Sequence, residues 1–286
     1  MVLTIDSLTK KYGDKTALDD LSYEFSAGIY GLLGPNGAGK STLMNIITCN
    51  TKATAGSVRV DGEDHRTMGK NYRRLLGFMP QKCEMYPEFT LNRFLYYMAA
   101  LKGITRKKAG AQIDELLRQV NLYDVRGQKL GGFSGGMKQR AMLAQALLGE
   151  PEIIILDEPT AGLDPKERIS LRNLIAQTAF DKIVIIATHV VQDIEFIAKD
   201  VLLLNKGKIA AQGAPFGLCE SIADKVFELD IPETAMRDVR AKYKIVNISS
   251  AAHGLNVRVI SDTEPEYEHR TVTPDLEDLY LYHFGE

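Results

Sequence analysis

Hydrophobic and polar positions alternate over much of the first 60 residues, a period of two that is typical of β-strands with one buried face. The alternation predicts strands at 2–8 and 21–25 and a short strand at 58–60. Residues 29–33 are instead a continuous apolar run that leads into a glycine-rich segment, as expected of a strand buried on both faces. The N-terminal part of the chain is therefore predicted to be mainly β-sheet.

Between residues 85 and 148 the hydrophobic period lengthens to between three and four residues, which is typical of amphipathic helices. The segments 90–101 and 109–120 show this period, and Thr90 stands where a helix N-cap is expected. The pattern predicts a mainly helical block inserted in a sheet-forming chain.

After Pro151, short apolar segments alternate with amphipathic ones. Strands are predicted at 153–156, 183–187 and 201–204, and helices at 166–177 and 191–198. Strands connected by helices pair in parallel, and strands that are apolar throughout need helices on both faces. The fold class that follows is α/β, with a parallel or mixed sheet between layers of helices.

The last 60 residues change pattern, and the charge changes with it. Their elements are predicted at 226–231, 233–242, 245–248, 255–260 and 275–284, in the order β–α–β–β–α. Residues 221–286 hold 13 acidic and 7 basic side chains, whereas residues 1–220 hold 24 acidic and 28 basic ones. We therefore expect two domains, a large one over 1–220 with its helical part at about 85–148, and a small α+β domain over 223–286.

Composition excludes several classes of protein. The 286 residues carry a net charge of −2, which gives no basis for binding nucleic acid or an anionic membrane surface. No apolar run approaches the roughly 20 residues of a membrane-spanning helix, and the N-terminus shows no secretory signal pattern. Cys49, Cys83 and Cys219 are far apart and odd in number, so they predict neither a disulfide framework nor a metal site. We expect a soluble chain in a reducing, cytoplasmic compartment.

A phosphate-binding loop is the first feature that indicates chemistry. The segment at 34–41 fits the pattern GxxxxGK[ST] and consists of Gly34, Pro35, Asn36, Gly37, Ala38, Gly39, Lys40 and Ser41. Its glycines let successive backbone N–H groups point at a triphosphate, and the helix predicted at 42–48 directs the positive end of its dipole there. Lys40 is expected to bridge the β- and γ-phosphates, and the Ser41 hydroxyl to bind Mg²⁺.

Two adjacent carboxylates end the apolar strand predicted at 153–156. Ligands of parallel sheets bind at the carboxyl ends of the strands, so Asp157 and Glu158 are expected to meet the phosphate loop. Asp157 would hold Mg²⁺, directly or through water. Glu158 would orient and deprotonate the attacking water.

A second helix start suited to binding an anion lies at Ser134, where a serine in the cap position precedes Gly135 and Gly136. One nucleotide needs only one such cradle. An ordinary capped helix is the alternative explanation for this segment.

With its motifs in this order, the sequence resembles the nucleotide-binding subunits of ABC transporters over about residues 1–220. The matching features are Tyr12 at the position of the adenine-stacking aromatic, the Walker A loop from Gly34 to Thr42, the Q-loop glutamine Gln81, the signature sequence FSGGMKQ at 133–139, the Walker B segment ILDE at 155–158, the D-loop from Ala161 to Asp164, and the switch histidine His189. The resemblance implies the P-loop NTPase fold of an ABC ATPase, with N-terminal antiparallel strands, a helical subdomain and a small C-terminal α+β extension.

The resemblance also implies how such a chain uses ATP. Members of the family form a head-to-tail dimer that holds two ATP molecules, each between the Walker A loop of one subunit and the signature sequence of the other. Ser134, Gly135 and Gly136 would then contact the γ-phosphate across the interface, and Asp164 of the D-loop would belong to the same site. Hydrolysis at Glu158 would release the closed dimer.

Two further residues have roles that the resemblance implies. His189 would contact the γ-phosphate, and Gln81 would link the Mg²⁺ ion and the attacking water to a separate membrane subunit. Tyr86 and Phe89, which follow Gln81, are expected to line the groove in which that membrane subunit docks.

The sequence departs from the family pattern at Phe133 and Met137, which replace the commoner leucine and glutamine of the signature. The backbone N–H groups and Ser134 are unaffected, so activity is expected to survive. The catalytic set is complete, which is consistent with a working homodimer, although pairing with a second ATPase subunit is an alternative. That set consists of Lys40, Asp157, Glu158 and His189, and Gln81 is expected to take part in catalysis beside it.

The end of the chain, VTPDLEDLY at 272–280, resembles the close of ATP-binding subunits from the type-2 class of exporters. This implies a separate integral membrane permease, a peripheral position on the cytoplasmic face of the cell membrane, and export of a peptide or drug-like amphipath. The alternatives are a soluble ABC ATPase without a transporter, and the ATPase of an importer. The extension itself would stabilise the fold, join the two ATPase subunits or regulate them.

Overall fold

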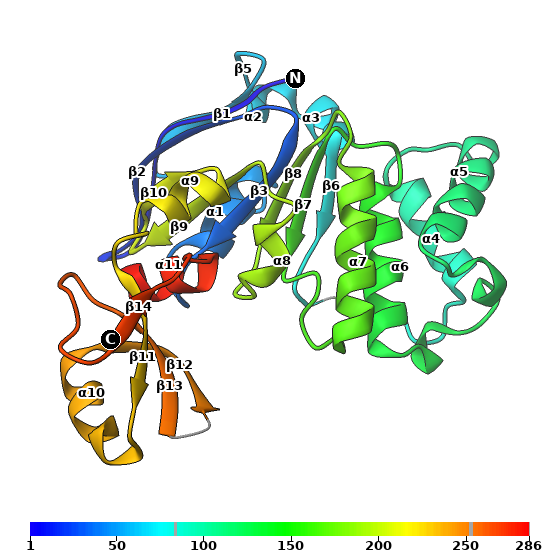
Figure 1. Ribbon diagram of the computed structural model, residues 1–286. Helices are drawn as coiled ribbons and strands as arrows, with labels where there is room; N and C mark the ends of the chain where they lie inside the picture. The colour runs from blue at the N-terminus through cyan, green and yellow to red at the C-terminus, as the bar shows by residue number, and fades with distance from the viewer. Residues whose placement is uncertain (83–84, 252–253, 286) are drawn as a thin grey trace.

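The computed structural model describes residues 1–82, 85–251 and 254–285, and it centres on a six-stranded mixed sheet (Figure 1). The sheet has the order β10-β9-β3-β8-β7-β6, and all neighbours pair in parallel except the edge strand β10. Its strands are β3 (Gly28–Leu33), β6 (Leu76–Met79), β7 (Ile153–Asp157), β8 (Ile183–Ala187), β9 (Asp200–Asn205) and β10 (Lys208–Gly213). The predicted α/β class with a parallel or mixed sheet is confirmed.

Both faces of this sheet are buried, because successive side chains of its strands point in opposite directions. In β7, Ile153 and Ile155 pack in one hydrophobic cluster, which includes α1 (Lys40–Ile47) and the N-terminal strands. Ile154 and Leu156 pack in the other cluster, which includes the longer helices of the chain. Two-sided burial is the physical reason for the continuous apolar runs in the sequence.

A second, antiparallel sheet of order β2-β1-β4-β5 lies beside α1. Its strands are β1 (Leu3–Tyr12), β2 (Lys15–Phe25), β4 (Ala55–Val60) and β5 (Glu63–Asp64). β1 and β2 extend beyond the predicted strands as a hairpin whose end is exposed, where Tyr12 pairs with Lys15, although Leu18 of this extension is fully buried. Two short helices, α2 (His65–Met68) and α3 (Lys70–Leu75), connect this sheet to β6.

The predicted helical block is confirmed. It contains α4 (Leu91–Leu101), α5 (Arg106–Gln119) and α6 (Gly135–Leu147). Thr90 caps α4 as expected, since its hydroxyl accepts a hydrogen bond from the Arg93 backbone N–H at 3.2 Å. Figure 1 shows α6 and α7 (Pro165–Thr178) between the central sheet and the pair α4–α5.

The C-terminal residues form a third sheet, of order β12-β13-β11-β14, with α10 over one face. Its elements are β11 (Val226–Ile231), α10 (Met236–Lys242), β12 (Lys244–Ala251), β13 (Gly254–Ile260) and β14 (His269–Thr271). The last helix, α11 (Leu276–Phe284), packs on β12 and also on α8 (Gln192–Glu195) and α9 (Pro215–Glu220), and Leu276 and Leu279 belong to the main core. The division of the chain at residues 220–223 stays a prediction.

Some elements differ from the prediction. The helix expected at 191–198 is reduced to the single turn α8, because the chain must turn to enter β9 at Asp200, and Phe196 is left exposed. The sequence pattern did not predict the short elements β5, α2, α3, β6, β10, α9 and β14.

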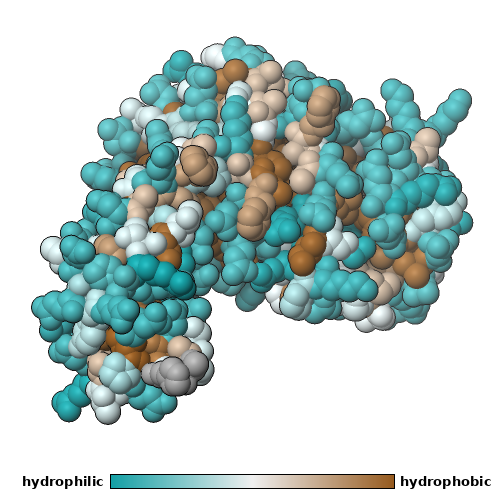
Figure 2. Space-filling view, viewed as in Figure 1, coloured by the Kyte–Doolittle hydropathy of each residue, from teal (hydrophilic) through white to brown (hydrophobic). Residues whose placement is uncertain are grey.

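The surface is mainly hydrophilic on the face shown in Figure 2, with hydrophobic side chains gathered near the middle of that face. Among the described residues, no helix combines the length and the apolar character that crossing a bilayer requires.

Candidate functional site

The glycine-rich loop lies between β3 and α1, and its shape excludes side chains at two positions. Gly34 and Gly39 have φ angles of 149° and 114°, which residues with a Cβ rarely adopt. A Cβ atom on Gly34 would lie 2.3 Å from the Leu204 carbonyl oxygen, and one on Gly39 would lie 2.7 Å from that of Ala17. The loop is therefore held as a bare backbone cradle against its neighbours.

Lys40 begins α1 and turns its ammonium group back over this cradle. Its Nζ atom donates hydrogen bonds to the carbonyl oxygens of Gly34 and Pro35. Burial lowers the pKa of the lysine, while the nearby charges of Glu158 and Asp157 act in the opposite direction. The chain thus places one cation beside two carboxylates.

A hollow of about 230 Å³ brings together most of the residues predicted from the sequence. Those that line it are Tyr12, Asn36, Gly37, Ala38, Gly39, Lys40, Ser41, Thr42, Gln81, Asp157 and Glu158. Gly34 and Pro35 contact Lys40 rather than the hollow itself. His189 does not line the hollow, but it contacts Glu158 directly.

Glu158 follows β7 in a left-handed backbone conformation, with φ of 51°. Its amide donates to the Ala187 carbonyl at 2.8 Å, and this bond holds the residue against the end of β8. The carboxylate is 8% exposed, and its Oε2 atom accepts a hydrogen bond from the Thr188 hydroxyl at 3.2 Å. His189 Nδ1 lies 2.9 Å from the same oxygen. A buried carboxylate in a strained conformation, oriented by two neighbours, is typical of a catalytic group.

Asp157 ends β7 beside Glu158. Burial and the charge of Glu158 raise the pKa of its carboxyl group to about 6, and Lys40 offsets only part of this. The site thus holds two carboxylates whose mutual repulsion a further cation would relieve.

The other predicted phosphate contacts lie elsewhere on the chain. Ser134 caps α6 by accepting a hydrogen bond from the Met137 N–H at 3.2 Å, and Ser134 and Gly135 are exposed. A Cβ atom on Gly136 would overlap the carboxylate end of the Glu167 side chain, which would have to move away. Asp164 caps α7 through the Glu167 N–H at 2.8 Å. None of these four predicted residues lines the hollow around Lys40.

Sequence reasoning missed a buried network that joins the segments carrying Glu158 and His189. Asp193 in α8 is 4% exposed, and its Oδ2 atom accepts a hydrogen bond from the hydroxyl of Thr160, which is 3% exposed. Arg168 of α7 completes the network, with Nε 3.3 Å from Asp193 Oδ1. An acidic residue in an amphipathic segment is expected to face solvent. The sequence therefore does not indicate that Asp193 is buried.

The two departures from the signature pattern are packing residues. Phe133 is buried in the main cluster, and Met137 packs against the same cluster. Neither substitution removes a polar group from Ser134 or from the backbone of α6, so the helix start keeps its donors.

An aromatic surface lies on α4 and the segment before it. Phe89 and Tyr97 line a groove of about 580 Å³, together with Arg93, whose guanidinium lies 4.1 Å from the centre of the Phe89 ring. Tyr86 does not line this groove, but it stacks on Phe89 with ring centres 4.9 Å apart. Cys83 lies outside the described residues.

The raised pKa of Asp157 predicts how its replacement changes stability. The carboxyl group of Asp157 binds its proton more tightly in the folded chain than in the unfolded chain, where its pKa has the ordinary value of 3.8. The free energy of unfolding therefore falls as the pH rises from about 4 to about 6. Asp157→Asn removes that cost, so we expect the ligand-free variant to be more stable at pH 7.5 by about 1.5 kcal/mol, half the full effect because the carboxyl group is partly exposed.

Thermal unfolding at pH 7.5 and pH 4.5 measures this effect. We expect Asp157→Asn to raise the Tm by roughly 3 °C at pH 7.5 and by only about 1 °C at pH 4.5. Asp114→Asn, on the exposed face of α5, serves as the control and should change neither Tm. An equal shift at both pH values would show that the charge of Asp157 is not the cause.

Comparison with known proteins identifies the family. The chain matches the family model described as ABC transporter over residues 18–161. It is 34% identical over 291 residues to the Nod factor export ATP-binding protein I of Burkholderia lata. This alignment covers 96% of this chain and 94% of the relative. It is also 32% identical to the probable multidrug ABC transporter ATP-binding protein YbhF of Escherichia coli, over 98% of this chain and 51% of the relative.

A solved structure supports the same assignment. It is a dimeric, post-hydrolysis state of an ATP-binding cassette bound to ADP and Pi, 27% identical to this chain, with a TM-score of 0.66 over 74% of this chain and 98% of that one. The family match includes Lys40, Asp157 and Glu158. The chain therefore belongs to the ABC transporter family, as an ATP-binding subunit that hydrolyses ATP.

Proposed function

We propose that this ATPase subunit drives export of a peptide or drug-like amphipath through a separate membrane permease. The observation that carries the proposal is the extent of the similarity to a protein named for export. An alignment over 96% of this chain must include most of residues 223–286, beyond the part that contains the ATP site motifs. The probable multidrug ABC transporter ATP-binding protein of Escherichia coli also aligns over 98% of the chain, and its name supports a drug-like cargo.

ATP would bind in the hollow formed by the phosphate loop, with its phosphates against the backbone N–H groups from Asn36 to Thr42 and against the Lys40 ammonium group. Tyr12 lies at the exposed end of the β1–β2 hairpin and lines the same hollow. Its ring is 49% exposed, which leaves a face free for stacking on adenine.

The residues around the phosphates also fit a Mg²⁺ ion. Ser41, Gln81 and Asp157 line the same hollow and offer oxygen atoms, which are the donors that Mg²⁺ prefers. Burial and the charge of Glu158 raise the pKa of Asp157, and a divalent cation bound here would favour the charged form of both carboxylates. When bound, the ion would neutralise charge on the phosphates of ATP.

Glu158 would act as the general base that takes a proton from the attacking water. Its Oε2 atom is held by Thr188 and His189, so the carboxylate points in one direction before ATP binds. His189 is itself exposed and lies beside the hollow, which leaves it able to contact the γ-phosphate.

A second subunit would complete each ATP site. Ser134 and Gly135 are exposed donors at the start of α6, and they lie outside the hollow around Lys40. A head-to-tail dimer would bring this helix start against the ATP of the partner, where its N–H groups and dipole would bind the γ-phosphate. Asp164, at the start of α7, would lie in the same interface.

The membrane subunit would dock on the aromatic groove of α4. Phe89, Arg93 and Tyr97 provide apolar surface and one cation there, a composition typical of protein interfaces. Gln81 lies between this groove and the ATP site along the chain, and it lines the hollow with Asp157. It would therefore transmit the state of the nucleotide to the permease.

A transport assay tests the proposed function. Inside-out membrane vesicles that contain this chain and its co-purified membrane subunit should accumulate a fluorescent amphipathic peptide when ATP is added. Glu158→Gln serves as the control, because it should bind ATP and hold the dimer closed while reducing turnover by at least 100-fold. Accumulation only in right-side-out vesicles would indicate import, and the absence of any membrane subunit would indicate a soluble ATPase.

The buried Asp193 network predicts a positioning effect on catalysis. Asp193→Asn keeps the size of the side chain but removes the charge that pairs with Arg168. The segments that carry Glu158 and His189 are then no longer held at a fixed distance from each other. We expect kcat for ATP hydrolysis to fall about tenfold with little change in KM, because ATP contacts neither residue of the pair.

The control for this prediction is Glu195→Gln in the same helix, whose carboxylate accepts a hydrogen bond from the Leu276 N–H at 3.3 Å. Steady-state ATPase kinetics of both variants should show the loss in Asp193→Asn alone. An equal loss in both variants, or a rise in KM without a fall in kcat, would contradict the positioning role.

A further inference from the structure

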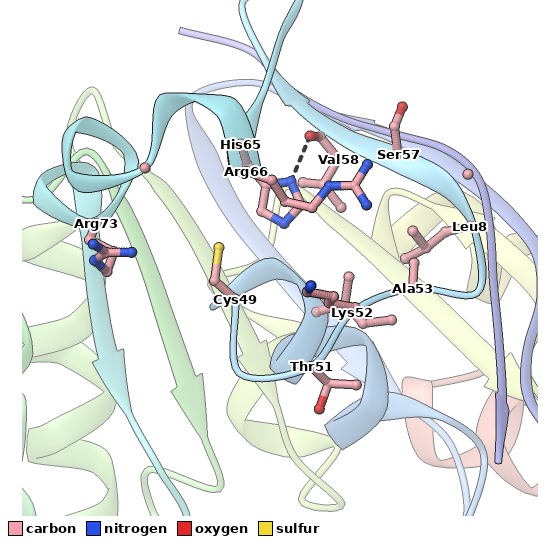
Figure 3. A pocket seen from close by; sticks show the side chains of 13 residues that line it. Leu8, Cys49, Thr51, Lys52, Ala53, Ser57, Val58, His65, Arg66 and Arg73 are labelled. Atoms are coloured by element: carbon pink, nitrogen blue, oxygen red, sulfur yellow. Dashed lines mark hydrogen bonds between the residues drawn. The ribbon is translucent and has the colours of Figure 1, made fainter.

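A second hollow, of about 400 Å³, lies away from the ATP site (Figure 3). Its walls come from the segment after α1, from the strands β1 and β4, and from α2 and α3. It shares no lining residue with the hollow that contains Lys40 and Glu158. No step of ATP hydrolysis proposed above uses it.

The charged residues that line this hollow are all basic. Lys52, Arg66 and Arg73 line it, and no carboxylate among the described residues does. The adjacent Asp64 pairs with Arg66 at 2.9 Å, and Arg66 lowers the pKa of that carboxyl group to about 2. Lys52 and Arg73 make no ion pair within residues 1–82, 85–251 and 254–285, so their two charges are uncompensated.

The negative pole of α1 points toward this hollow, but its terminal carbonyl groups are already occupied. The Met44 carbonyl accepts from the Thr48 hydroxyl at 2.8 Å, and the Asn45 carbonyl accepts from two backbone N–H groups. The Ile47 carbonyl accepts from the Tyr72 hydroxyl at 2.7 Å. These internal donors offset the negative partial charge at the C-terminal end of α1. The electrostatic potential in the hollow is therefore set mainly by the basic side chains.

A buried histidine forms part of the wall. His65 is 4% exposed, and its Nδ1 atom lies 2.9 Å from the Val58 carbonyl oxygen, which can only accept a hydrogen bond. The Nδ1 atom therefore carries a proton. Figure 3 shows the second ring nitrogen turned to the side of the hollow on which Cys49 and Lys52 lie. It has no hydrogen-bond partner in the part of the chain that the structure describes.

We propose that this hollow binds a phosphate-bearing ligand, either a small phosphate ester or the headgroup of an anionic phospholipid. Arg73 and Lys52 would pair with the phosphate oxygens, because uncompensated arginine and lysine side chains bind such groups through charge-assisted hydrogen bonds. Ile46, Val58 and Leu8 add apolar surface to the lining, which suits the organic part of the ligand. The site is separate from ATP hydrolysis and gives the subunit a second ligand.

Cys49 allows a direct test of whether the electrostatic potential in the hollow is positive. Its side chain lines the hollow and is exposed, whereas Cys219 is buried. In a full-length chain with Cys83 replaced by serine, we expect a negatively charged methanethiosulfonate to modify Cys49 about tenfold faster than a positively charged one of similar size.

Two neighbouring arginines on α3 provide a matched pair of variants. Arg73→Glu should bring the ratio of the two modification rates to about one or below, because it reverses a charge that lines the hollow. Arg74→Glu makes the same change next to it, at a residue outside the lining, and should leave most of the preference in place. Equal rates in the unaltered chain, or equal effects of the two variants, would overturn the proposal.

Protection of Cys49 from the uncharged reagent iodoacetamide distinguishes the two sources of phosphate. Protection by millimolar glycerol 3-phosphate indicates a soluble ester, and protection by vesicles with phosphatidylglycerol, but not by phosphatidylcholine vesicles, indicates a lipid headgroup. Either form of protection should be lost in Arg73→Glu and kept in Arg74→Glu, which excludes an effect transmitted from the phosphate loop. Protection by neither ligand would overturn the proposal.

Discussion

The pairing of β7 with β8 is the constraint on which the rest of the site depends. In this register Asp157 lies opposite Ala187, and the next amide, that of Glu158, donates to the Ala187 carbonyl at 2.8 Å. Both strands therefore end at the same edge of the sheet, which places His189 Nδ1 2.9 Å from the Glu158 carboxylate. A shift of one residue would turn Asp157 to the opposite face of the sheet and would separate this pair.

Several charged side chains lie close together at the same edge of the sheet, and neighbouring segments hold them in position. Lys40, Asp157 and Glu158 meet in one partly buried hollow, and burial disfavours the charged form of both Lys40 and Asp157. Such an arrangement costs stability and is typical of a site that is completed by a charged ligand. The surrounding segments are fixed by Asp193 and, through Glu195, by the first N–H group of α11. The C-terminal helix thus contributes to the support of the segment that carries His189.

Sequence patterns predicted the parallel sheet, the helical block and the phosphate loop, because each depends on short-range periodicity or on a contiguous motif. The phosphate loop and the pair Asp157–Glu158 do line one hollow, as the shared edge of a parallel sheet requires. The burial of Asp193 and the packing of α11 on α8 depend on contacts between distant segments, which no local pattern encodes. Short elements such as β6, with a glycine among only four residues, carry too little periodicity to be recognised.

Cross-linking between two chains tests whether they form the proposed head-to-tail dimer around ATP. Lys15 lines the ATP hollow and Lys138 lies in the first turn of α6, and both are exposed. In a background without the native cysteines and with Glu158→Gln, Lys15→Cys chains are mixed with Lys138→Cys chains and treated with a short bis-maleimide. In a head-to-tail dimer, the two kinds of chain should be cross-linked to each other only when ATP is present. A cross-link that forms equally without ATP, or one that joins only Lys138→Cys chains to each other, would contradict it.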